Sequence, residues 1–115
     1  MKQYLDQQQT AKLIELGFEK PKSEKWVLDI ANESTPSILN IVKRYDYSIG
    51  ELLSFLPENI AKENEMPSTL NISLLNGEWC VEYADFLGAD FLFRSVELID
   101  AVFNMIVKLK EEGVI

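Results

Sequence analysis

The amino-acid sequence predicts an α+β fold, in which a small antiparallel sheet carries an N-terminal, a middle and a long C-terminal helix. One observation is a β-hairpin pattern over residues 70–83. Another is a set of helix start and stop signals around three apolar segments. The 115 residues are 47% apolar and 26% charged. This length and composition are typical of one soluble globular domain, spanning residues 1–115.

The first helix is predicted to begin after Asp6, whose carboxylate can accept hydrogen bonds from the free amides of the first turn. Gln9 lies three residues later, as a capping box requires. Gly17 is expected to end the helix in the left-handed conformation, with Phe18 folding back in a Schellman motif.

Two segments between the first and second helices favour strands to different degrees. Residues 26–30 (WVLDI) are rich in β-formers, and we expect them to join the sheet of the hairpin. Residues 36–45 (PSILNIVKRY) fit two structures. Their apolar spacing and Pro36 suit a helix, whereas their β-branched side chains suit an extended segment, so this conformation stays open.

A sharper start signal precedes residues 49–56. Ser48 and Glu51 form a capping box, and Tyr47 and Leu52 are spaced as a hydrophobic staple. Pro57 is expected to end this second helix. The polar, proline-bounded residues 57–68 are predicted to form a loop.

Asn76-Gly77 is the strongest short signal for a two-residue hairpin turn of type I′. The predicted register runs from Leu75 opposite Glu78 to Leu70 opposite Tyr83. Side chains alternate along a strand, so one face collects Leu70, Ile72, Leu74, Trp79, Val81 and Tyr83. The other face carries Asn71, Ser73, Leu75, Glu78, Cys80 and Glu82. We expect the helices to cover the first face.

The C-terminal helix is predicted to begin with Ser95 as its cap and to end at Gly113. Phe103 and Val107 widen its apolar stripe to more than half the circumference, while Asp100 is assigned to the solvent side. A stripe this wide indicates that the helix packs against the sheet and also contacts a further element on its flank. That element is another helix or another subunit.

The charge balance restricts the partners. Lys and Arg total 11 and Asp and Glu total 19, which gives a net charge of −8. Such a surface repels phosphate, so nucleic acid and membrane are not expected partners, whereas a basic protein is. A single cysteine excludes an internal disulfide, and no apolar run approaches the ~20 residues that span a bilayer. We therefore expect a cytoplasmic protein.

The chain offers few groups for catalysis. It has no histidine and no glycine-rich phosphate loop. Cys80 is predicted to be a structural thiol in mid-strand, because Glu78 and Glu82 beside it disfavour the thiolate. Those two acids form a cluster in sequence with Asp85 and Asp90, but their spacing matches no metal-binding loop. We expect no enzyme activity, no metal and no cofactor.

The segments YSIGELLSFLP, NGEWCVEY and ELIDAVFNMIVKLKEEGVI carry a resemblance. In these segments the chain resembles small uncharacterised proteins of phages and other mobile elements of gut Bacteroides-type bacteria. The resemblance implies a phage or prophage setting and favours an extended conformation before YSIGELL. It implies no catalytic residue, because the shared positions are caps, stops and core.

Two functional hypotheses follow. In the first, the protein acts by protein–protein contact, with a different protein or with a second copy as a homodimer. Its candidate binding face comprises Glu78, Glu82, Asp85, Asp90, Phe103 and Val107. In the second, the chain mimics nucleic acid and inhibits a DNA-binding protein of the host, which requires carboxylates spaced like phosphates on one face.

Overall fold

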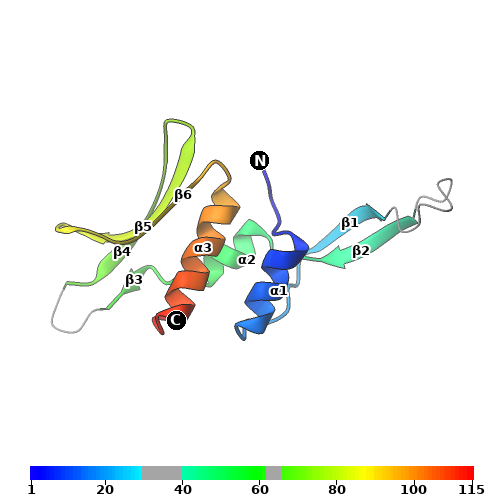
Figure 1. Cartoon of the computed structure of the whole chain (residues 1–115), viewed down its shortest axis with the longest axis horizontal. Helices are drawn as coiled ribbons and strands as arrows, with labels where there is room; N and C mark the ends of the chain where they lie inside the picture. Colours follow the sequence, from blue (N-terminus) through cyan, green and yellow to red (C-terminus); the bar gives the residue numbers. More distant parts are fainter. Residues whose placement is uncertain (30–39, 62–65) are drawn as a thin grey trace.

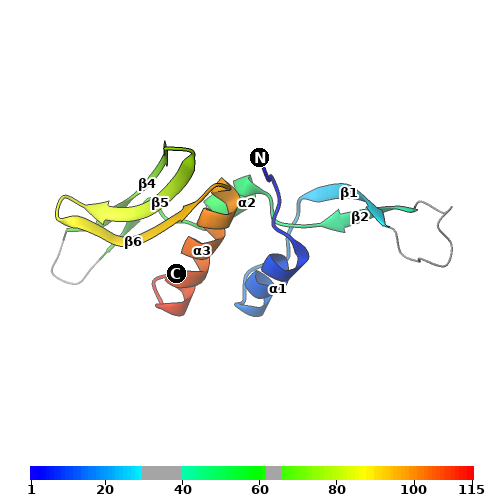
Figure 2. The same ribbon diagram turned by 45° about the horizontal axis from the view of Figure 1, so that its top comes forward.

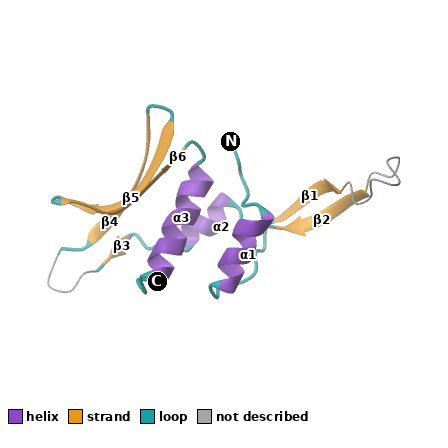
Figure 3. Ribbon diagram, in the orientation of Figure 1, coloured by secondary structure: helices purple, strands orange, loops and turns teal. Residues whose placement is uncertain are grey.

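The computed structural model describes residues 1–29, 40–61 and 66–115 and confirms the α+β class. Within these ranges, three helices lie in the middle of the molecule, and a sheet lies at each end of them (Figures 1 and 3). One sheet has two antiparallel strands and the other has four, in the order β3-β4-β5-β6. Because the sheets lie at opposite ends, the molecule measures 62 × 34 × 19 Å (Figure 2).

Helix α1 (Gln7–Glu15) has the predicted caps. The Asp6 carboxylate accepts a hydrogen bond from the Gln9 amide at 2.8 Å, and the Gln9 side chain accepts one from the Asp6 amide at 3.1 Å. At the other end Gly17 adopts a φ of +99°, and the Phe18 amide donates to the Leu13 carbonyl at 3.1 Å. This geometry confirms the Schellman motif.

Strands β1 (Glu24–Asp29) and β2 (Asn40–Tyr45) pair only with each other among the described residues. The strand predicted at 26–30 therefore exists as far as Asp29, but its placement in the sheet of the hairpin is wrong. Pairing with the next strand along the chain closes a short loop, which costs less entropy than reaching the distant hairpin. Of the open segment 36–45, residues 40–45 are strand; Ile30 and residues 36–39 lie outside the described residues.

Helix α2 (Ile49–Ser54) begins with the predicted capping box of Ser48 and Glu51, and it ends slightly before the predicted boundary. The two-residue strand β3 (Asn59–Ile60) follows and pairs with the start of β4. The prediction of a loop over residues 57–68 is therefore wrong at Asn59, Ile60 and Ser68, which lie in strands. A strand this short acquires its conformation from the neighbouring strand, and its own sequence carries no strand pattern.

The hairpin of β4 (Ser68–Leu75) and β5 (Glu78–Asp85) has the predicted register. Every pair from Leu75↔Glu78 to Leu70↔Tyr83 is present, and the pairing continues to Thr69↔Ala84. Asn76 and Gly77 have φ values of +51° and +79°, as a type I′ turn requires.

We expect Gly77→Ala to lower the free energy of unfolding by about 1–2 kcal/mol, because a Cβ disfavours positive φ. An added Cβ at Gly77 meets no atom within 4 Å, so the cost arises in the backbone alone. Gly50→Ala in α2 is the matched control. Its Cβ would lie 3.9 Å from the Ser48 hydroxyl, and we expect it to stabilise the fold slightly. Urea unfolding of both variants measures the difference; equal effects would contradict the turn assignment.

Strand β6 (Gly88–Ser95) was not predicted. It pairs with β5, placing Phe93 opposite Val81 and Phe91 opposite Tyr83, with a bulge beside Tyr83 and Ala84. The only local signal for this strand is the short apolar run Phe91-Leu92-Phe93, whose aromatic side chains favour a strand without a two-residue alternation.

The start of α3 (Leu98–Glu111) differs from the prediction, whereas its end agrees. Ser95 is the last residue of β6, and Glu97 occupies the cap position without a side-chain capping bond. The Ser95 hydroxyl instead accepts a hydrogen bond from the Glu97 amide at 3.1 Å. Gly113 ends the helix with a φ of +73°.

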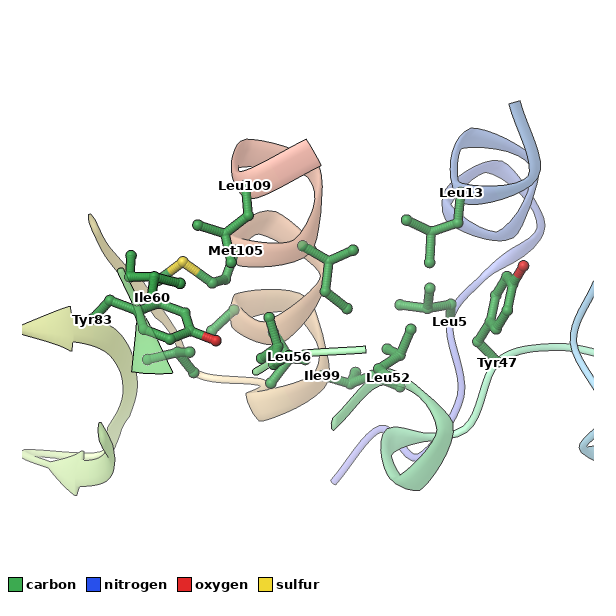
Figure 4. Packing of buried hydrophobic residues seen from close by; sticks show 14 residues of the cluster. Leu5, Leu13, Tyr47, Leu52, Leu56, Ile60, Tyr83, Ile99, Met105 and Leu109 are labelled. Atoms are coloured by element: carbon green, nitrogen blue, oxygen red, sulfur yellow. The ribbon is translucent and has the colours of Figure 1, made fainter. Parts of the chain in front are cut away.

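Helix α3 lies at the centre of the core. Figure 4 shows Tyr83 and Ile60 on one side of this helix and Leu5 and Leu13 on the other. Its wide apolar stripe is therefore covered from both sides by elements of the same chain, without a second subunit. Asp100, which was assigned to solvent, accepts hydrogen bonds from the Lys2 ammonium at 2.8 Å and from the side-chain amide of Gln9 at 2.9 Å.

Candidate functional site

The four acidic residues that are clustered in sequence occupy different places. Glu78 and Glu82 lie on β5, on the face of the sheet that turns away from the helices. Asp85 accepts a hydrogen bond from the Leu87 amide at 2.8 Å in the β5–β6 turn, and Asp90 accepts one from the Ser68 hydroxyl. In the described part of the chain, no three His, Cys, Asp or Glu side chains are grouped so as to hold a metal ion.

Cys80 lies in mid-strand between Glu78 and Glu82, as predicted, and opposite Ser73. Its neighbour on the other side is Arg94, which the sequence pattern did not place there because β6 was not recognised. Together with Leu75 and Asn76, these residues line a pocket of about 340 Å³. The thiol is therefore partly buried among side chains of both charges.

Phe103 and Val107, the apolar candidates for a binding face, are partly buried and pack against the core from α3. They lie apart from the acidic candidates on the outer face of the sheet. The predicted candidates therefore do not converge on one surface.

The apolar face of the hairpin is only half covered. Val81 and Tyr83 are fully buried, whereas Ile72 and Leu74 expose 37% and 56% of their surface. In Figure 1 the turn between β4 and β5 extends beyond the helices at the top of the view. The expectation that the helices cover this whole face is therefore wrong for its outer half, because α3 is shorter than the reach of the hairpin.

Strand β4 forms an edge of the sheet from Asn71 onwards. Among the described residues, β3 pairs only with Ser68 and Thr69, and the Leu70 amide donates to the Glu58 carbonyl at 2.9 Å. The preceding chain leaves the strand at Pro57, whose carbonyl accepts a hydrogen bond from the Tyr83 hydroxyl at 2.6 Å. Burial raises the pKa of Tyr83 to about 12, so this donor keeps its proton at neutral pH.

We call residues 71–75 the β4 edge. All five are exposed, and the strand from Ser68 to Leu75 contains no charged residue and no proline. Free sheet edges are ordinarily protected by charges, prolines, bulges or a covering element, because they pair readily with other chains. The described structure provides none of these protections here. The lack of charge is visible in the sequence, but the edge position depends on the strand order.

Acidic groups border the β4 edge on one face. Glu78 and Glu82 lie on β5 opposite Leu75 and Asn71, on the face that turns away from the helices. A second exposed apolar pair, Phe86 and Leu87, lies at the other end of the sheet, in the β5–β6 turn. This pair lies on a turn and not along a free strand, so it offers no comparable backbone edge.

Comparisons with known proteins add no family to these observations: no family model, no curated protein and no solved structure matches the chain. None of the helices in residues 1–29, 40–61 and 66–115 has the length and apolar character needed to cross a membrane.

Proposed function

We propose that this protein acts by binding another protein through the β4 edge and the uncovered side chains of Ile72 and Leu74. The observation that supports this proposal most strongly is a five-residue strand edge that is uncharged and exposed on both faces. An unprotected edge of this kind is a liability in a protein that has no partner for it. The resemblance to phage and mobile-element proteins suggests a partner inside the bacterial host.

The charge of the chain favours a protein over nucleic acid as this partner. A net charge of −8 repels phosphate. The alternative of a nucleic-acid mimic needs an array of exposed carboxylates, but several acids are engaged within the fold. Asp46 pairs with Lys25, and Asp100 pairs with Lys2. The proposal therefore rests on the apolar edge and not on a carboxylate array.

The test compares two double variants in affinity purification from the native host. Ile72→Lys/Leu74→Lys places charges on the β4 edge, where natural edges carry them, and we expect it to lose the captured partner. Phe86→Ser/Leu87→Ser removes apolar groups that are more exposed, at 77% and 83%, at the other end of the sheet, and we expect it to retain the partner.

Circular dichroism establishes that both double variants fold, and light scattering gives the mass of the unmodified chain. Capture of the same protein by the lysine variant would contradict the assigned surface. A strictly monomeric chain that recovers no host protein would contradict the proposed function itself.

A further inference from the structure

We infer that the partner binds as an added β-strand along the β4 edge, and that its bound segment alternates apolar and basic residues. This inference rests on the proposed function and specifies the chemistry of the partner. Strand addition to a free sheet edge is a common mode of peptide recognition, in which backbone hydrogen bonds supply affinity and alternate side chains supply specificity.

The backbone of the β4 edge is oriented for this pairing. The Leu70 amide points away from β5, since it donates to the Glu58 carbonyl at 2.9 Å. Peptide groups in an antiparallel strand alternate in direction, so the amides and carbonyls of Ile72 and Leu74 also point outward. Those of Asn71, Ser73 and Leu75 point toward β5, with which these residues are paired. Ile72 and Leu74 thus offer two donors and two acceptors to an added strand.

The side chains of the edge specify the alternation. On the helix side, the added strand would lie beside Ile72 and Leu74, which are exposed and apolar, so apolar side chains fit there. On the opposite face it would lie beside Asn71, Ser73 and Leu75. Glu78 and Glu82 lie one strand further, about 10 Å from the added backbone. Lysine or arginine side chains that lean across β4 can approach these carboxylates.

Charge distinguishes this partner from a second copy of the chain. Two copies joined along this edge would each carry a net charge of −8, and the β4 strand that the second copy adds contains no lysine or arginine. Arg94 approaches Glu78 and Glu82 from the β6 side, whereas a basic segment supplies cations from the β4 side. A basic segment is also attracted from a distance by the negative surface. The observations therefore favour a basic partner.

The probe is a synthetic peptide of about nine residues in which valine and lysine alternate, titrated calorimetrically into the full chain. We expect binding that weakens severalfold when salt rises from about 50 to about 300 mM, because added salt screens the charge pairs. A peptide that alternates valine and glutamate should bind at least about tenfold more weakly.

The matched variants are Leu74→Pro and Leu74→Ala. Both remove the leucine side chain, but only proline removes the outward amide, and it leaves the hydrogen bonds between β4 and β5 intact. We expect Leu74→Pro to bind the peptide at least about tenfold more weakly than Leu74→Ala. A lysine–valine peptide with N-methyl groups on alternate residues tests the same bonds in the unmodified protein, and we expect it not to bind.

Several results would overturn the inference. Equal binding by the two Leu74 variants, together with binding of the N-methylated peptide, would exclude strand addition. Equal binding of the glutamate peptide would exclude the basic partner. A dimer that Leu74→Pro dissociates would identify a second copy as the occupant. In each of these cases the capture experiment with the lysine variant still tests the proposed function separately.

Discussion

Tyr83→Ala is expected to lower the free energy of unfolding by about 3–5 kcal/mol, which is a large part of the stability of a domain this size. Tyr83 is fully buried at the junction of sheet and helices. Figure 4 shows its ring beside Ile60 and Met105. Its removal leaves a cavity between β5 and α3 and also removes the hydrogen bond to the Pro57 carbonyl.

Tyr83→Phe separates these two effects. It keeps the ring and loses only the hydroxyl, which donates to the Pro57 carbonyl at 2.6 Å. We expect this variant to lose about 1–2 kcal/mol, because the carbonyl is left without its partner. Chemical denaturation followed by tryptophan fluorescence measures both variants. If alanine destabilised the protein no more than phenylalanine does, the ring would not be part of the core.

Lys25→Met is expected to lower the free energy of unfolding by about 3 kcal/mol, because it leaves a buried carboxylate without its cation. Asp46 is only 3% exposed, and its carboxylate lies 3.2 Å from the Lys25 ammonium. The Thr10 hydroxyl donates to the same carboxylate at 3.2 Å. This group joins α1 to the base of the β1–β2 hairpin, so its loss loosens that attachment.

Lys25→Met/Asp46→Leu is the control, since replacing both members of a buried pair by apolar groups is often nearly neutral. Thermal unfolding of both single variants and of the double variant measures the coupling between the two residues. Additive effects of the two changes would contradict the ion pair.

Local features of this protein could be predicted from sequence. The capping boxes at Asp6 and Ser48 and the stops at Gly17 and Gly113 depend on residues a few positions apart. The hairpin register depends only on the Asn76-Gly77 turn and on the two-residue period of the flanking strands. Hydrogen bonds and backbone preferences within such short segments depend little on distant contacts, so the sequence predicts most of them. The cap predicted at Ser95 is the exception, because β6 extends through that residue.

The candidate binding surface depended on contacts between distant segments. Whether Ile72 and Leu74 are covered depends on where α3 ends relative to the hairpin, and whether β4 is an edge depends on how far β3 extends. The position of Arg94 beside Cys80 depends on the pairing of β6 with β5. No local sequence pattern encodes these contacts between distant segments. The free energy of each strand pairing depends on which other strands and helices compete for the same position. The sequence alone thus determined the three helices and one hairpin, while the tertiary structure decided the remaining strands and which strand edge stays free to bind.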